Sequence, residues 1–256
     1  MDSEKLQGRV AMVTGAAGGI GKATAFKMVR EGASVALLDI LAKELGQTVE
    51  ELKALGGKAL GLIVDVGQKK EVEKAVAKGI EHFGRVDILV NNAGVVRPAP
   101  LENVQEEDWD AVVKVNFKGT FFCTQAVLPA MKKNRYGKII NIGSRASLGK
   151  EERTVYSATK AGLIGVTRTW ALELAPYNIN VNCIGPGPIA TKLFRANNPE
   201  GSEKTRAIIN GIPLKRMGQP EDVANLASFL ASEEASFITG QVIFICGGLT
   251  VGLVHY

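Results

Sequence analysis

Short apolar segments alternate with amphipathic segments along almost the whole chain, and this alternation limits the possible folds more than any other feature. Seven segments are short, β-branched and almost uniformly apolar, as strands buried on both faces must be. Six longer segments between them have helical periodicity. Such alternation is typical of a doubly wound parallel sheet with right-handed crossovers. The expected strands are 9–14, 34–39, 58–64, 87–91, 137–142, 178–184 and 242–246, and the expected helices are 19–31, 41–56, 68–83, 105–134, 154–175 and 219–232.

No linker, internal repeat or low-complexity tract divides the chain. We therefore expect residues 1–256 to form a single α/β domain, a Rossmann-like parallel sheet of about seven strands with helices on both faces. Ligands of such sheets bind beyond the carboxyl ends of the strands, so the strand ends are where functional residues are expected.

Composition and charge argue against several classes of function. The net charge of +5 includes basic runs at 69–70 and 131–138 that lack interleaved aromatic residues, so no nucleic-acid partner is expected. Cys123, Cys183 and Cys246 have no CxxC spacing, which indicates reduced thiols in a cytoplasmic protein and no metal site. The first residues lack the apolar core of a signal peptide, and no apolar stretch reaches the about 18 residues of a membrane span, so no membrane association is expected.

A glycine-rich stretch, TGAAGGIG, follows the first expected strand and opens the first expected helix. Glycine lets the backbone turn sharply and approach a ligand, and a helix N-terminus offers free N–H groups to a pyrophosphate. A glycine-rich turn without a ligand is the alternative, but a strand before it and a helix after it are the context that a dinucleotide site requires. The expected cofactor contacts here are Gly15, Gly18, Gly19, Ile20 and Gly21.

Asp39 ends the second expected strand, eighteen residues past Gly21. A carboxylate at this place accepts hydrogen bonds from the adenosine ribose hydroxyls and repels a 2′-phosphate. Neither Ala17, Gly18 nor Ile40 supplies a cation for such a phosphate. We therefore expect NAD(H) rather than NADP(H), with Asp39 and Ile40 in the cofactor site. The alternative is that Asp39 only caps the helix that follows it.

Tyr156 and Lys160 lie four residues apart in YSATK, so one helix face carries both. Alone, this pair is equally consistent with a surface aromatic residue beside a solvated lysine. Several further motifs stand in register with it, and together they resemble the short-chain dehydrogenase/reductase family. The motifs are TGAAGGIG, NNAG (91–94), Ser144, YSATK and PGPIAT (186–191), in the order and spacing of that family.

The resemblance runs from about residue 8 to residue 250 and implies an oxidoreductase that moves a hydride between NAD(H) and a secondary alcohol or ketone. It implies that Tyr156 is the acid/base, and that Lys160 lowers the pKa of the phenol and holds the nicotinamide ribose. Ser144 would hydrogen-bond the substrate oxygen. Asn116 would hold a water that links Lys160 to solvent, unless its side chain only bonds the helix backbone.

Ser144 departs from the family pattern in one respect, because its 12-residue distance to Tyr156 is one residue shorter than in many members. Gly143 stands at the usual distance and has no hydroxyl. We expect a one-residue deletion in the loop 146–154 that leaves Ser144 in place, and Ser147 is the competing serine.

The resemblance also implies further cofactor contacts at the ends of other strands. Turn formation without any ligand is the alternative for each of them. The expected contacts are Asp65 and Val66 after the third strand, Asn92, Ala93 and Gly94 after the fourth, and Pro186, Gly187, Ile189 and Thr191 after the sixth.

Two rival functions remain open. An NADPH-dependent 3-oxoacyl-thioester reductase on the same fold is disfavoured by Asp39, and a dinucleotide-binding scaffold without turnover is disfavoured by the intact set of four catalytic residues. A Ser-His-acid hydrolase is unlikely, because His82 and His255 stand near no plausible nucleophile.

The substrate is the least constrained part of the prediction. The polar segment 191–213 is expected to cover the pocket as a lid, and its cations would either attract an anionic substrate such as an acyl-CoA or lie on an ordinary solvated helix. The loop KEER, 150–153, is unusually charged for a pocket wall, so either it points outward or the substrate is polar.

We expect a homotetramer, because two helices carry apolar residues on more than one face. In the family these helices commonly pair across twofold axes, and the C-terminal residues 249–256 are a candidate second interface. The residues concerned are Phe117, Phe121 and Phe122 on helix 105–134 and Leu163, Val166, Trp170 and Leu174 on helix 154–175.

Overall fold

The computed structural model of the chain describes residues 4–251, without the side chains of residues 193 and 197. Within this range a single parallel sheet contains seven strands in the order β3-β2-β1-β4-β5-β6-β7. The strands are β1 (Val10–Thr14), β2 (Ser34–Asp39), β3 (Ala59–Ile63), β4 (Ile88–Asn91), β5 (Gly137–Ile142), β6 (Ile179–Pro186) and β7 (Val242–Ile245). The principal helices are α1 (Gly19–Arg30), α2 (Ala42–Ala54), α3 (Lys69–Phe83), α4 (Glu106–Val113), α5 (Gly119–Asn134), α6 (Thr154–Leu174), α7 (Lys192–Asn197), α8 (Glu203–Gly211) and α9 (Pro220–Ala231).

Every strand pair in the sheet is parallel, and the chain winds in both directions from β1. The order therefore reverses between β1 and β4, which is the switch point where ligands of doubly wound sheets bind. All residues of β1, β4 and β5 are buried, as the uniformly apolar sequences predict. The predicted fold and all seven predicted strands are confirmed.

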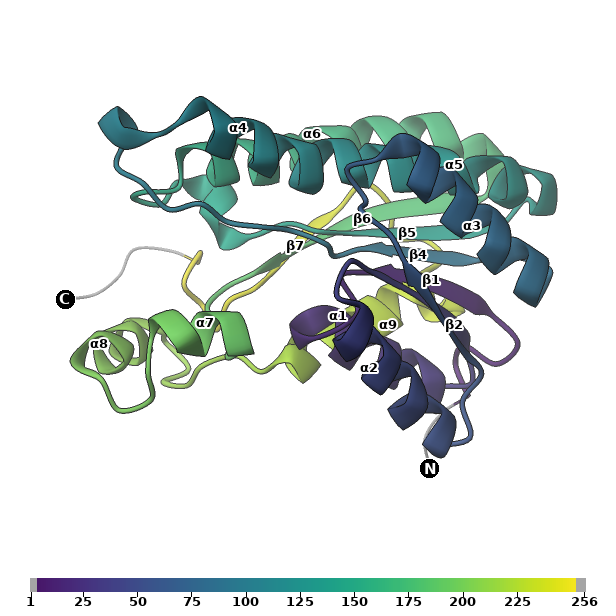
Figure 1. Cartoon of the computed structure of the whole chain (residues 1–256), viewed down its shortest axis with the longest axis horizontal. Coiled ribbons are helices and arrows are strands. Elements are labelled where there is room, and N and C mark those ends of the chain that lie inside the picture. The colour runs from purple at the N-terminus through teal and green to yellow at the C-terminus, as the bar shows by residue number, and fades with distance from the viewer. Residues whose placement is uncertain (1–3, 252–256) are drawn as a thin grey trace.

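Two helical layers cover the sheet (Figure 1). Helices α3, α4, α5 and α6 lie on one face, and α1, α2 and α9 lie on the other. Each layer has its own apolar core, one that includes Met28, Leu52 and Leu230 and another that includes Val76, Val127 and Met131. Burial of these side chains on both sides of the sheet fixes the strand ends that carry the candidate site.

The predicted helix 105–134 differs from the structure in one turn. A wide π-helical turn, Lys114–Lys118, joins α4 to α5 and contains Asn116. Such turns are rare and are frequently found at functional sites. Side-chain periodicity does not reveal a single extra residue in a helix, so the sequence could not predict it.

The segment predicted to be a lid contains two short helices, α7 and α8, separate from the layers that cover the sheet (Figure 1). Thr191 caps α7 by accepting a hydrogen bond of 3.2 Å from the Phe194 N–H. Ser202 caps α8 in the same way at 3.2 Å from Thr205. In residues 4–251, no helix combines the length and the apolar character needed to span a membrane.

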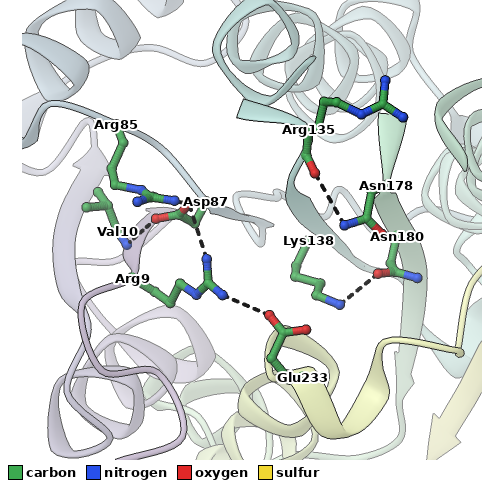
Figure 2. Close-up of polar contacts among 9 residues, drawn as sticks. All are labelled: Arg9, Val10, Arg85, Asp87, Arg135, Lys138, Asn178, Asn180 and Glu233. Atoms are coloured by element: carbon green, nitrogen blue, oxygen red, sulfur yellow. Dashed lines mark hydrogen bonds and ion pairs between the residues drawn. The ribbon is translucent and has the colours of Figure 1, made fainter. Parts of the chain in front are cut away.

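A charged network joins the amino ends of the central strands, on the edge of the sheet away from the predicted site (Figure 2). The Asp87 carboxylate is fully buried and accepts hydrogen bonds from the Val10 N–H at 2.9 Å and from the Arg85 Nε at 2.9 Å. Arg9 lies between Asp87 and Glu233 and stacks 3.8 Å from the centre of the Tyr136 ring. This network ties β1 to β4 and to the segment after α9.

Candidate active site

The glycine-rich turn between β1 and α1 leaves room for a ligand at the start of the helix. Gly15 has φ +64°, and a Cβ there would lie 2.9 Å from the Ala93 Cα, so only glycine fits. Gly18 precedes α1 without a side-chain cap, and a Cβ added to it would meet nothing within 4 Å. The first N–H groups of α1 therefore have no side-chain partner, which suits a pyrophosphate.

The other predicted residues of this turn have structural contacts. Gly21 packs so closely against the Gly15 carbonyl that a Cβ would overlap it. The Ile20 side chain packs against the apolar core, so only its backbone can face a cofactor. Gly19 lies beside Thr191, whose Cγ2 would be 3.3 Å from an added Cβ. The glycine-rich turn thus contacts the segment after β6 at Gly19 and Thr191.

Asp39 binds the glycine-rich turn directly. Its carboxylate accepts the Ala17 N–H at 2.9 Å through one oxygen and the Leu41 N–H at 3.0 Å through the other. The second bond joins Asp39 to the N-cap residue of α2, and no side chain caps that helix, so the alternative prediction that Asp39 only caps it is wrong. Carboxylate oxygens have further lone pairs, so these bonds leave Asp39 able to accept from ribose hydroxyls. Ile40 is 64% exposed and offers an apolar surface next to this carboxylate.

Asn92 anchors the turn rather than pointing to open space. Its side-chain amide donates to the Thr14 carbonyl at 2.9 Å and to the Gly15 carbonyl at 3.0 Å. The Thr14 hydroxyl accepts the N–H groups of Asn92 at 2.9 Å and Ala93 at 3.0 Å. The donors of the Asn92 side chain are thus engaged within the turn, so the backbone of this segment stays the predicted cofactor contact. Thr14 was missed, although its position at the end of β1 was a usable signal.

Asp65 is held by a lysine that the sequence did not connect to it. Lys114 donates to the carboxylate at 2.9 Å, and the Gly67 N–H donates at 2.9 Å. Desolvation opposes ionisation of Asp65, but these two donors outweigh it and hold the pKa of the carboxyl below its usual value. Val66 is buried and packs against Gly119, so it offers its backbone only.

Tyr156 and Lys160 lie one turn apart on α6, with the Lys160 Nζ 5.6 Å from the centre of the Tyr156 ring. Lys160 is 4% exposed and donates to the Ile142 carbonyl at the end of β5 at 2.6 Å. Burial lowers the pKa of Lys160 to about 8. A solvated surface lysine is therefore excluded.

Among the groups of the chain itself, burial has the largest effect on the pKa of Tyr156. Burial raises the pKa of the phenol, and the Ser144 hydroxyl and the Arg153 charge only partly oppose this effect. The Lys160 ammonium, whose Nζ lies 5.6 Å from the ring centre, donates to the Ile142 carbonyl.

Ser144 reaches Tyr156 in spite of the short spacing. It follows β5, and its hydroxyl interacts with the Tyr156 hydroxyl while accepting the Ala146 N–H at 3.0 Å. Ser147 lies one 3₁₀ turn further on, and its buried hydroxyl has no hydrogen-bond partner within the described residues. The geometry favours Ser144 over Ser147.

Asn116 is fully buried in the π-helical turn and fixes the segment after β4. Its side chain accepts the Val95 N–H at 2.8 Å and donates to the Val95 carbonyl at 2.9 Å. A Cβ added to Gly94 would lie 3.3 Å from the Asn116 Oδ1 and 3.7 Å from the Lys160 Nζ. Asn116, Gly94 and Lys160 therefore meet, although the Asn116 side chain is committed to a neighbouring loop rather than to its own helix.

The segment after β6 closes the site from the lid side. Pro186 ends β6, and the Gly187 N–H donates to the Ile245 carbonyl at 2.7 Å. Ile189 is buried and pairs with Gly218, so its side chain belongs to the core. Thr191 caps α7 and lies against Gly19, which brings it to the glycine-rich turn.

The strand ends thus gather the glycine-rich turn, the Asp39 carboxylate and a tyrosine–serine–lysine cluster at one edge of the sheet. A glycine-rich helix start and a buried tyrosine–lysine pair at the switch point of a doubly wound sheet fit the class of dinucleotide-dependent oxidoreductases.

Comparisons with known proteins agree with this class. A family model described as "Enoyl-(Acyl carrier protein) reductase" matches residues 15–250. The (2S)-[(R)-hydroxy(phenyl)methyl]succinyl-CoA dehydrogenase subunit BbsD of Thauera aromatica is 45% identical over 95% of this chain and 97% of its own. The 3-oxoacyl-[acyl-carrier-protein] reductase FabG of Thermotoga maritima is 46% identical over 96% of this chain and 100% of its own. A solved structure from Agrobacterium tumefaciens, named as a candidate gluconate dehydrogenase, is 32% identical, with a TM-score of 0.93 over 99% of this chain and 100% of that one.

The chain belongs to the short-chain dehydrogenase/reductase family. It is an oxidoreductase that uses a nicotinamide dinucleotide, and the predicted resemblance and general function are confirmed.

Proposed function

We propose that this oxidoreductase moves a hydride between NAD(H) and a secondary alcohol or ketone, with Tyr156 as the acid/base. The observation that supports it most is the cluster of Tyr156, Ser144 and Lys160 beside the glycine-rich turn that Asp39 binds. A bound nicotinamide dinucleotide supplies the hydride donor or acceptor and, when oxidised, a positive charge.

The residues of this chain handle the proton and the geometry. The Tyr156 hydroxyl would give a proton to the substrate oxygen in reduction, its phenolate would take one in oxidation, and Ser144 would donate a hydrogen bond to the same oxygen. Lys160 and Asn116 hold the segment after β4 and the end of β5 in place around them. Because burial raises the pKa of Tyr156, a nearby positive charge would favour the loss of its proton in the oxidation direction.

Asp39 supports NAD(H) over NADP(H). Its carboxylate would repel a 2′-phosphate, and the neighbouring Ile40 and Leu41 are exposed and uncharged. For the proposed contacts, Gly18 and Gly19 take the pyrophosphate, Asp39 the adenosine ribose, and Thr191 the nicotinamide carboxamide.

A second candidate is an NADPH-dependent 3-oxoacyl-thioester reductase. The names of two relatives favour a thioester substrate, since one contains a 3-oxoacyl-[acyl-carrier-protein] and the other a succinyl-CoA. Asp39 disfavours NADPH as the cofactor, but it does not bear on whether the substrate is a thioester.

Initial rates with a panel of secondary alcohols, 3-hydroxyacyl-CoA esters and the matching ketones separate the candidates. We expect kcat/KM to be at least about tenfold higher with NAD(H) than with NADP(H). Asp39→Ala should abolish this preference, because it removes the carboxylate that repels the 2′-phosphate of NADP(H). Equal kcat/KM with the two cofactors in the unchanged protein would contradict the NAD(H) assignment. A preference for NADPH with 3-oxoacyl thioesters would establish the second candidate.

A further inference from the structure

A lysine at the start of the π-helical turn binds a carboxylate that follows another strand. Lys114 is the first residue of the turn Lys114–Lys118, and its Nζ donates to the Asp65 carboxylate at 2.9 Å. The apolar stem of Lys114 packs on Gly67, because a Cβ added to that glycine would lie 2.6 Å from the Lys114 Cγ and Cε. The side chains of this ion pair are 40% exposed for Lys114 and 25% exposed for Asp65. None of the proposed steps of hydride transfer uses this ion pair.

The far end of the same turn rests on the same loop. Gly119 follows the turn, and a Cβ added to it would lie 2.9 Å from the Val66 Cγ2 and 3.3 Å from the Val66 carbonyl oxygen. The Asp65 N–H donates to the Glu71 carboxylate on α3 at 3.0 Å, so α3 holds the loop in place. Because π-helical turns are rare, contacts outside the helix must favour this one over a continuous α-helix. The loop 65–67 supplies such contacts at both ends of the turn.

The middle of the turn contacts the segments that carry the candidate catalytic residues. Asn116 lies two positions beyond Lys114, and residues two apart point to different sides of a helix. Its side chain binds the Val95 N–H and carbonyl at 2.8 and 2.9 Å, and its Nδ2 lies 3.5 Å from the Thr159 hydroxyl. The Thr159 hydroxyl donates to the Tyr156 carbonyl at 2.9 Å. The turn therefore joins the loop after β3 to the segment after β4 and to α6.

We propose that Lys114 is a positioning residue for catalysis. Its ion pair with Asp65 sets the π-helical turn, so that Asn116 holds the segment after β4 and helix α6 in register with each other. The inference rests on the proposed function, to which it adds a residue that acts only through others. A partly exposed ion pair contributes little to stability, but small displacements of reacting groups lower rates strongly, so the effect of Lys114 belongs in kcat.

Three variants of the full chain separate the ion pair from a general effect on the helix. Lys114→Met removes the ammonium and keeps an apolar stem on Gly67, and Lys114→Arg keeps a cation within reach of Asp65. Lys118→Met is the matched control, because Lys118 ends the same turn at an exposed position. Within residues 4–251, no carboxylate oxygen lies within 4.0 Å of the Lys118 ammonium.

Amide hydrogen exchange at Val95 tests the inference without turnover. The Val95 N–H is bonded to the Asn116 side chain, so its exchange requires this contact to open. Measured by mass spectrometry with residue-level fragmentation on the protein without cofactor, this exchange should be at least about threefold faster in Lys114→Met. It should stay within about twofold of the unchanged protein in Lys114→Arg and Lys118→Met. Exchange at Leu89, buried within β4, should be the same in all variants and reports that the fold is intact.

Steady-state kinetics with the cofactor and substrate that the panel identifies shows whether this contact matters for catalysis. We expect kcat to fall about three- to tenfold in Lys114→Met, with KM for the cofactor within about twofold, and Lys114→Arg to keep most of the kcat. Asp65→Asn weakens the same ion pair from the other side. If Lys114 acts through Asp65, the variant with Lys114→Met and Asp65→Asn should lose no more kcat than the more impaired single variant.

Unchanged exchange at Val95 in Lys114→Met, or an equal fall of kcat in Lys118→Met, would overturn the inference. Faster exchange without a fall in kcat, or losses in kcat that multiply in the double variant, would overturn the positioning role as well. Faster exchange at Val95 in a protein whose Tyr156→Phe variant keeps near-normal turnover would contradict the proposed function alone. Loss of turnover in Tyr156→Phe beside an unaffected Lys114→Met would contradict the inference alone.

Discussion

Lys160 carries an ammonium group at a position that water does not reach, and its folded-state pKa of about 8 lies below the value of about 10.4 of a free lysine. The folded protein therefore binds fewer protons than the unfolded chain between these two values, so this residue's contribution to stability rises with pH there. Below pH 8 the buried charge costs up to about 3 kcal/mol relative to the neutral amine.

We therefore expect the free energy of unfolding of the unchanged protein to rise relative to Lys160→Met as pH increases from 7 to 10, by up to about 3 kcal/mol. Urea unfolding at several pH values measures the difference, and Lys74→Met, at an exposed position on α3, is the control. A difference between the unchanged protein and Lys160→Met that does not vary with pH would contradict burial of the charge.

At the scale of single residues, the sequence predicted which side chains gather but not what they bond. Tyr156, Ser144 and Lys160 were identifiable from their register, and the structure brings them together. The partners of Lys160 and Asn92 are backbone carbonyls, which every residue possesses, so no residue type marks them. Lys114 and Asp65 are 49 positions apart, and only the fold makes them neighbours.

At the scale of elements, the buried strands were predictable, because short and mostly apolar segments between helical segments indicate strands that are buried on both faces. The ends of the strands were less predictable. Strand β6 ends at Pro186, two residues beyond the predicted end at 184. The π-helical turn that carries Asn116 leaves the apolar pattern of α4 and α5 almost unchanged, so tertiary packing decides it.

The network at the amino ends of the strands is a stability feature of these elements (Figure 2). We expect Asp87→Ala to lower the free energy of unfolding by about 3–5 kcal/mol, because it leaves the Val10 N–H and two arginines without their buried partner. Asp108→Ala breaks an exposed pair with Arg97 and should cost no more than about 1 kcal/mol.

Chemical denaturation and kcat of both variants check this expectation. Turnover should stay nearly unchanged in Asp87→Ala under conditions where it is folded, since the network lies at the opposite edge of the sheet from Tyr156. An equal decrease in the free energy of unfolding in the two variants would contradict a stabilising role for the burial of Asp87.

At the scale of the whole molecule, the structure divides the apolar residues of the long helices between a buried face and an exposed face. Leu163 and Leu174 are buried within the chain, and Phe122 and Trp170 pack against the same core. The exposed large apolar side chains on α4, α5 and α6 are Trp109, Phe121 and Leu172, at 44%, 43% and 79% exposure, and of these the sequence predicted Phe121. Of the C-terminal candidate interface, residues 252–256 lie outside the described residues.

The homotetramer stays a prediction, now carried by these three side chains. Light scattering at micromolar concentration should give the mass of four chains, and Leu172→Glu should shift it to a smaller species by placing a charge in the interface. Leu55→Glu, at the end of α2 in the other layer, should not. A monomeric unchanged protein would contradict the prediction.

The whole account depends most directly on the phenol of Tyr156, and Tyr156→Phe removes that oxygen while keeping the ring. The decisive measurement is kcat of this variant, with NADH affinity determined beside it. We predict that kcat falls by about 10²–10⁴-fold, the usual effect of losing a general acid or base, while the Kd of NADH stays nearly unchanged. A variant that keeps near-normal turnover would contradict the assignment of Tyr156 as the acid/base and leave the pair on α6 without a catalytic role.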